Sequence, residues 1–128
     1  MWFIQVALLL AIAVPSSNGV LVITDINFDC LYHTYCYRIW LFEHDWLTPN
    51  DEMSNVQGCT RKHFVHQQLS GKISGDGLLD HGAEVYIRVR HNCTSGSHWN
   101  WFTEKVGDFD TRLTQVTGSV NVTITDKM

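Results

Sequence analysis

The four cysteines are the residues whose chemistry the sequence indicates most directly. Cys30, Cys36, Cys59 and Cys93 all follow residue 19, and no two of them form a Cys-x-x-Cys pair. Thiol ligation of a metal is therefore the weaker interpretation. An even number of cysteines in a small secreted domain predicts two disulfides, each worth about 2–4 kcal/mol of stability. Four cysteines allow three pairings, and the sequence alone does not choose among them.

Two asparagines stand in sequences that can accept an N-linked glycan in the secretory pathway. They are Asn92, in Asn92-Cys93-Thr94, and Asn121, in Asn121-Val122-Thr123. We expect a glycan on each of them. Asn121 is the safer of the two, because early closure of a disulfide at Cys93 could hide the neighbouring Asn92.

Acidic side chains in two turn-rich segments raise the possibility of a calcium site. Carboxylate oxygens are ligands that calcium prefers, and C2-type sandwiches bind calcium and lipid with paired acidic loops. The order of an EF-hand loop is absent, however, and acidic residues are common in turns for solvation alone. We therefore predict no metal site and no cofactor, and keep as the alternative a calcium-dependent, lipid-binding, C2-like domain. Its candidate ligands are Asp45, Asp51, Asp76 and Asp80.

The seven histidines give a weaker metal signal. His63 and His66 are three residues apart, which on a strand places them on opposite faces. No feature of the sequence aligns His91 with His98. We predict structural or surface histidines.

Motifs for catalysis are missing from the sequence. It contains no Gly-x-Ser-x-Gly, no papain-type cysteine context and no phosphate-binding glycine loop. We therefore predict no catalytic residues and expect that the protein is not an enzyme.

The aromatic content is high, and large aromatics usually fill the core of a small domain. Most of the clustered rings are expected there, although one exposed aromatic patch would mark a partner site. Trp99 and Trp101 share one face of a strand, so Phe102 points the other way. The rings considered are Trp40, Phe42, Trp46, Trp99, Trp101 and Phe102.

The first nineteen residues predict a cleaved secretory signal. Trp2 to Val14 form an apolar run of about 13 residues, shorter than the ~20 that span a bilayer, followed by small and polar residues before Val20. Residues 1–19 are thus the expected signal peptide, and residues 20–128 a single secreted domain without stable membrane insertion. The net charge of −4 and the pI near 5.9 argue against a nucleic-acid surface.

Short alternating segments predict the elements that position these residues. In one of them Val85, Ile87 and Val89 alternate with Tyr86, Arg88 and Arg90, which predicts a strand with one apolar and one polar face. The other expected strands are residues 20–28, 35–43, 62–69, 98–102 and 118–125. A loop is expected at 44–58 and turns at 70–82. No window shows a sustained period of 3.6, so at most one short helix is expected, around 104–113. The pattern predicts an all-β protein, an antiparallel β-sandwich of about seven short strands.

Four motifs, in their order and spacing, resemble the transthyretin-like family of nematode secreted proteins. They are Ile39-Trp40-Leu41-Phe42-Glu43-His44-Asp45, Asn50-Asp51-Glu52-Met53, Leu69-Ser70-Gly71 and Tyr86-Ile87-Arg88-Val89-Arg90-His91-Asn92-Cys93. Cys30 and the last strand, Ser119 to Thr123, also match. The family's second cysteine after His-Asn-Cys is missing, and Cys36 and Cys59 look like additions, so the family's disulfide pairing does not transfer.

The resemblance implies a divergent member with a transthyretin/immunoglobulin-like sandwich. It also implies a secreted protein whose role is extracellular binding or bridging without catalysis. The expected partner is an unknown extracellular protein or a cell-surface ligand.

Overall fold

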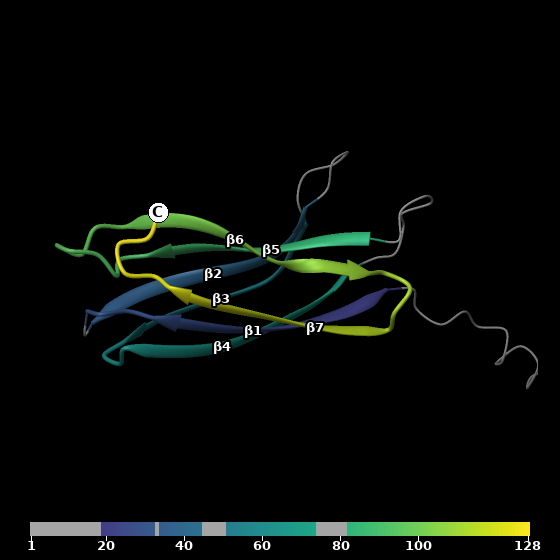
Figure 1. The fold of residues 1–128 in the computed structure, drawn as a ribbon, viewed down its shortest axis with the longest axis horizontal. Coiled ribbons are helices and arrows are strands. Elements are labelled where there is room, and N and C mark those ends of the chain that lie inside the picture. The colour runs from purple at the N-terminus through teal and green to yellow at the C-terminus, as the bar shows by residue number, and fades with distance from the viewer. Residues whose placement is uncertain (1–18, 33, 45–50, 74–81) are drawn as a thin grey trace, which may run out of the picture.

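Seven strands make up most of the chain that the computed structural model describes, which comprises residues 19–32, 34–44, 51–73 and 82–128 (Figure 1). The strands are β1 (Val20–Asp29), β2 (Tyr35–His44), β3 (Asp51–Thr60), β4 (Phe64–Ile73), β5 (Gly82–His91), β6 (Asn100–Asp110) and β7 (Gln115–Thr123). No helix occurs within these ranges, so none there could cross a membrane. The predicted signal segment lies outside them apart from Gly19.

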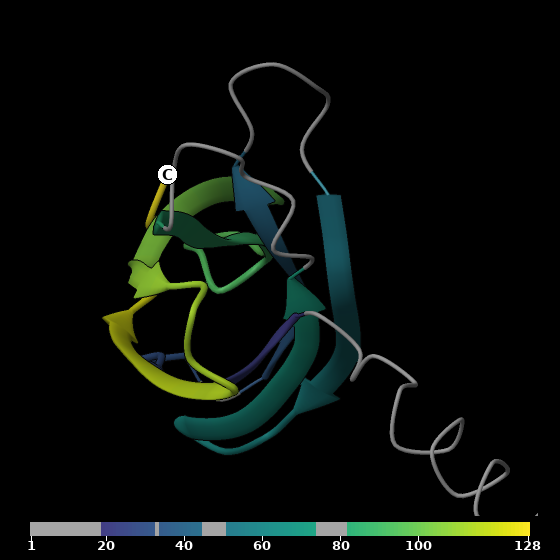
Figure 2. The same ribbon diagram turned by 90° about the vertical axis from the view of Figure 1, so that its right-hand side faces the viewer.

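The strands form two packed sheets, so the fold is an all-β sandwich as predicted. One sheet has the order β4-β1-β7 and the other the order β3-β2-β5-β6. Seen end-on, the two sheets enclose a common interior, and the connection from β3 to β4 passes from one sheet to the other on one side (Figure 2). All the neighbouring strand pairs are antiparallel except β1 and β7, which are parallel. The sandwich is therefore antiparallel with one parallel pair.

Alternating side chains of both sheets fill this interior. In β5, Val85, Ile87 and Val89 are fully buried, which confirms the predicted apolar face. In β1 the alternation is as regular, with every second residue from Val20 to Phe28 buried. Because successive side chains of a strand point to opposite faces, the same strands leave a complete second row for solvent or a partner.

Two predictions about individual elements were wrong, and one predicted strand has different bounds. The segment 44–58, expected as a loop, contains most of β3, and the expected strand at 62–69 begins at Phe64 and continues to Ile73. The region around 104–113 forms no helix. Instead, β6 continues to Asp110, hydrogen-bonded to β5 through a bulge at Val85 and Tyr86.

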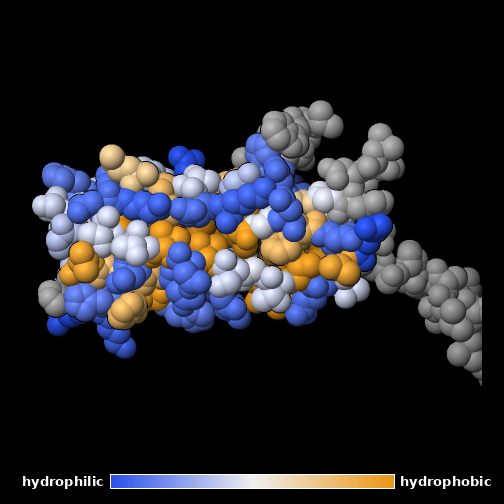
Figure 3. Space-filling view, viewed as in Figure 1, coloured by the Kyte–Doolittle hydropathy of each residue, from blue (hydrophilic) through white to orange (hydrophobic). Residues whose placement is uncertain are grey.

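An apolar seam separates the free edges of β6 and β7. Figure 3 shows apolar surface in a band along this side of the molecule, between two bands of hydrophilic side chains. Val106 and Phe109 of β6 and Val122 of β7 are partly buried against the core. A Cβ atom on Gly118 would collide with the Val106 side chain, so glycine allows the two edges to approach.

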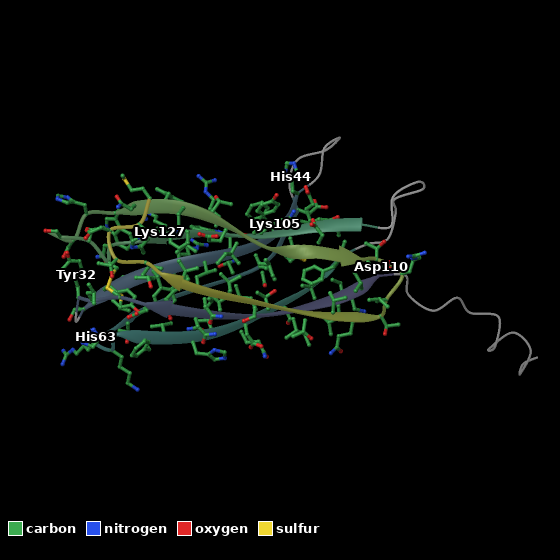
Figure 4. All side chains as sticks on the ribbon, in the orientation of Figure 1. Tyr32, His44, His63, Lys105, Asp110 and Lys127 are labelled. Atoms are coloured by element: carbon green, nitrogen blue, oxygen red, sulfur yellow. A yellow bond between two sulfur atoms is a disulfide. The ribbon has the colours of Figure 1, made fainter. Side chains whose placement is uncertain are left out.

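Both predicted disulfides are present, which settles the pairing. Cys30 after β1 bonds to Cys93 after β5, and both are fully buried, so this bridge joins the two sheets. Cys36 of β2 bonds to Cys59, its direct partner on β3. Tyr32 and His63 lie at the same end of the molecule (Figure 4). His63 Nδ1 is 2.8 Å from the Cys30 carbonyl oxygen.

Candidate binding face

The outer face of the four-stranded sheet carries an unusual concentration of aromatic and arginine side chains. They come from the strand positions that alternate with the core. Within β2 these positions include Arg38 and Trp40, and within β5 they include Arg88 and Arg90. Register places Trp40 opposite Arg88, and Trp101 of β6 opposite Arg90. We call this surface the arginine–tryptophan face; its residues are Arg38, Trp40, Arg88, Arg90, Trp99 and Trp101.

The rings and guanidinium groups of this face stack on one another. Trp40 and Trp101 lie two strands apart but lean together over β5, with ring centroids 5.4 Å apart and planes 15° from parallel. The Arg88 guanidinium carbon lies 4.5 Å from the Trp101 ring centroid, and that of Arg38 lies 4.7 Å from Trp40. The arginines are therefore held in place by cation–π contacts.

Arg90 extends the same stack to the edge of the sheet. Its guanidinium carbon lies 4.4 Å from the Trp99 ring centroid and 5.7 Å from that of Trp101. Trp99 and Trp101 have large apolar side chains, yet they remain 45% and 44% exposed. Contiguous exposed apolar area of this kind is characteristic of interaction surfaces.

A shallow depression lies beside the stack. It has a volume of about 240 Å³ and is lined by three aromatic rings and two side chains of opposite charge, Glu52 and Arg88. The rings are those of Trp40, Phe42 and Trp101. Apolar walls with a few polar groups are the usual composition of a binding pocket. This one has room for a side chain or a similar small group.

The arginines of the face have no acidic partner among the described residues. None of Arg38, Arg88 and Arg90 forms an ion pair there, whereas the nearby Lys105 is bound by Asp108 at 2.9 Å and by Glu84 at 3.5 Å. Arg38 and Arg90 are also directly opposite each other on neighbouring strands. Like charges in that position destabilise a sheet. The face is thus a positive surface on a protein whose net charge is −4.

The outer face of the other sheet differs in composition. A row of polar side chains crosses it, in which Asn27 Nδ2 donates to Asn121 Oδ1 at 3.0 Å and His66 Nδ1 lies 2.8 Å from Asn27 Oδ1. Asp25 accepts a hydrogen bond from Gln68 on the same face. These groups satisfy one another, so the arginine–tryptophan face is the stronger candidate for binding.

Comparison with protein-family models places residues 25–127 in a family described as Caenorhabditis elegans protein of unknown function (DUF870). The chain belongs to the DUF870 family. Comparisons with curated proteins and with solved structures gave no match. This match shows membership of a nematode family. The more specific resemblance to the transthyretin-like family stays a prediction.

In this DUF870 protein the aromatic rings are distributed differently from the prediction. Most were expected in the core, but of those that the structure describes only Phe102 is buried there. Trp40 and Phe42 are half-buried on the outer face, because no further layer covers β2 and neighbouring rings shield them instead. Trp99 and Trp101 share a face opposite to Phe102, as predicted. Trp46 lies outside the described residues.

The two predicted glycan sites have different surroundings. Asn121 is exposed on β7, and so is Thr123 of the same sequence motif. Asn92 is half-buried, and its Oδ1 accepts a hydrogen bond from the Cys36 backbone N–H at 2.6 Å. Thr94 is buried and donates its hydroxyl to the His98 carbonyl oxygen. In the folded chain, only the Asn121 motif is therefore presented to solvent.

Of the four candidate calcium ligands, only Asp51 is described. It is exposed at the start of β3, while Asp45, Asp76 and Asp80 lie outside the described residues. Within the described ranges no cluster of three or more histidine, cysteine or acidic side chains could hold a metal ion.

The histidines that sequence analysis considered have separate positions. His63 lies in the turn before β4, so the expectation that it shares a strand with His66 was wrong. His91 is fully buried and structural: its Nε2 lies 2.9 Å from the Lys127 carbonyl oxygen, and its Nδ1 accepts the Cys93 N–H at 3.1 Å.

The stacking itself is what sequence reasoning missed. Arg38 and Trp40 are two residues apart in the sequence, and so are Arg88 and Arg90, which is the period of a strand face. It indicated which side chains point outward. Their convergence required the register between β2, β5 and β6, which no local pattern encodes.

Proposed function

We propose that this DUF870 protein is a secreted, non-enzymatic binding module and that its arginine–tryptophan face binds another extracellular protein. The observation that carries the proposal is the exposed stack of tryptophans and arginines, in which no arginine has an acidic partner among the described residues. Tryptophan, tyrosine and arginine are the residues most enriched at the energetic centres of protein–protein interfaces. Large, rigid rings bury much area there at a small cost in conformational entropy.

Location outside the cell is supported by several independent features. The two disulfides suit an oxidising compartment, and the apolar run from Trp2 to Val14 has the length of the apolar core of a signal peptide. The resemblance to the transthyretin-like family implies the same location and an extracellular binding or bridging role. A divergent membership in that family is therefore part of the proposal.

The test compares binding of labelled protein to nematode tissue before and after removal of one ring. Trp101→Ser removes a ring from the centre of the face, and Phe64→Ser is the matched control. Phe64 is 72% exposed on the outer face of the three-stranded sheet. Both variants lose an exposed aromatic side chain, and circular dichroism and thermal melting verify that each is folded.

We expect Trp101→Ser to weaken saturable tissue binding at least about tenfold, which is typical of a central interface residue. The control is expected to bind within about twofold of the unaltered protein. Equal binding by all three proteins, or equal loss in both variants, would contradict the proposed role of this face.

A further inference from the structure

We infer that the face binds an extended acidic segment of its partner, with carboxylates at alternate residues and an apolar side chain at the next alternate position. This inference rests on the proposed function and names the chemistry of the ligand. It depends on three features of the face: the type of its cations, their spacing and the position of the depression.

The cations of the face are all arginines, and none of them forms an ion pair with another described residue. A guanidinium group that lies flat over an indole ring uses its plane for stacking and keeps the N–H groups at its edge for hydrogen bonds. Those donors match the two oxygens of a carboxylate, which they bind as a pair. Since Arg38, Arg88 and Arg90 are held over Trp40, Trp101 and Trp99, little side-chain freedom remains to be lost on binding.

The spacing of the arginines is that of an extended chain. Arg88 and Arg90 are two residues apart on β5, about 6.6–6.8 Å along the strand. An extended segment lying on the face presents every second side chain toward it at the same repeat. Carboxylates at positions i and i+2 would therefore meet Arg90 and Arg88, with Arg38 beside Arg90 to share the first of them.

The depression continues this line. Arg88 forms part of its wall, together with Glu52 and the rings of Trp40, Phe42 and Trp101, so the pocket adjoins the second carboxylate position. The Glu52 carboxylate would repel a third acidic side chain there, which favours an apolar one. An apolar side chain two residues further along the segment would reach it. The expected pattern is acidic–x–acidic–x–apolar.

A protein segment fits this surface better than a sulfated polysaccharide does. Trp40 and Trp101 already cover each other, and the guanidinium groups lie over the rings, so few ring faces are left for a sugar to stack on. The one lysine nearby, Lys105, is engaged by Glu84 and Asp108. The positive charge that remains has the planar, paired donors of arginine.

The experiment uses calorimetric titration of the folded, oxidised protein with synthetic peptides. The probe is Leu-Thr-Glu-Thr-Glu-Thr-Leu, which reads the same in both directions and so needs no assumption about strand polarity. The control peptide, Leu-Thr-Thr-Glu-Glu-Thr-Leu, has the same composition and charge but adjacent glutamates. Heparin-derived oligosaccharides form a third arm.

Two charge-matched double variants accompany the peptides. Arg88→Gln with Arg90→Gln removes two positive charges from the face, and Arg61→Gln with Lys62→Gln removes two from the exposed turn between β3 and β4. We expect the probe to bind about tenfold more tightly than the control peptide, because only it reaches both arginines. The first double variant should abolish this preference, and the second should keep it.

Four outcomes would overturn the inference. Equal binding of the two peptides would refute the alternating spacing, and binding of heparin without the probe would make the ligand a polysaccharide. Sedimentation showing a dimer that the Arg88/Arg90 variant loses would make the occupant a second copy of the chain. If tissue binding still depends on Trp101 while the probe fails to bind, the proposed function stands and only the acidic segment is wrong.

Discussion

At the scale of single residues, His91 is the ionisable side chain most tightly built into the structure. Its ring is fully buried beside the Cys30–Cys93 bridge, and both nitrogens are hydrogen-bonded. Because Nδ1 accepts the Cys93 N–H, Nε2 carries the proton and donates to the Lys127 carbonyl oxygen. Burial lowers the pKa of His91 below its ordinary value, and this outweighs the Lys127 carbonyl and the Asp126 carboxylate, which raise it. The neutral ring thus joins the end of β5 to the C-terminal residues.

This arrangement predicts a loss of stability in mild acid. The unfolded chain protonates the histidine near pH 6.5, whereas the folded chain does so only at lower pH. The stabilisation from neutral His91 is therefore complete above about pH 6.5 and is lost as the pH falls through that value toward the folded pKa. We expect the melting temperature of the unaltered protein to fall between pH 7.5 and pH 5.

Thermal melts of two glutamine variants check the assignment. His91→Gln should be less stable at pH 7.5 and should show a smaller fall in melting temperature toward pH 5. His98→Gln, which alters an exposed histidine, should retain the slope of the unaltered protein. A slope that His91→Gln leaves unchanged would place the pH sensitivity elsewhere.

At the scale of elements, local patterns predicted the strands that have one face in the core. β5 and β1 alternate strongly because burial selects apolar residues on one side only. β3 was missed because it is an edge strand whose ten residues, Asp51–Thr60, include many polar types and none fully buried. No sustained period of 3.6 supported the short helix expected around residues 104–113, and pairing with β5 makes most of this stretch part of β6.

The candidate site was predictable only in part for the same reason. The period of two within each strand tells which side chains point outward, and these include Arg38, Trp40, Arg88 and Trp101. Which of them touch follows from strand order and register, and these depend on contacts between residues far apart in the sequence. The disulfide pairing was undetermined for the same reason, since Cys36 and Cys59 become neighbours only through the β2–β3 register.

The two disulfides are expected to stabilise the fold unequally. Cys30–Cys93 closes a separation of 63 residues and joins the two sheets, whereas Cys36–Cys59 closes 23 within one sheet. Loop-closure entropy alone gives about 4 kcal/mol for the longer loop and about 3 kcal/mol for the shorter. Replacing the fully buried Cys30 and Cys93 by serine also buries two hydroxyl groups that need partners.

Urea unfolding of the two double serine variants measures this difference. Cys30→Ser with Cys93→Ser should lower the free energy of unfolding by more than Cys36→Ser with Cys59→Ser does. The contributions should not add, because the shorter loop lies within the longer one. A larger loss from the Cys36/Cys59 variant would show that the β2–β3 edge contributes more than the link between the sheets.

At the scale of the whole molecule, the sandwich separates two chemically different outer faces. The four-stranded sheet presents arginines and tryptophans without acidic partners in the described chain, and the three-stranded sheet presents a row of amides, hydroxyls and a histidine. The exposed Asn121 belongs to the second face. A glycan there would project away from the proposed binding surface. It would also shield the edge strand β7, whose free backbone groups could otherwise pair with another chain.

This division predicts one glycan, on Asn121, in protein secreted from eukaryotic cells. Asn121 and Thr123 are exposed, while Asn92 uses its side-chain oxygen to bind the Cys36 backbone and Thr94 is buried. Glycosidase treatment should remove the mass of a single glycan, and Asn121→Gln should abolish that change.

Asn92→Gln should keep the glycan but lower the free energy of unfolding by about 1–3 kcal/mol, because the Cys36 N–H loses its acceptor. The glycosylated and deglycosylated proteins should bind nematode tissue equally, and weaker binding of the glycosylated form would mean that the partner also contacts the three-stranded sheet.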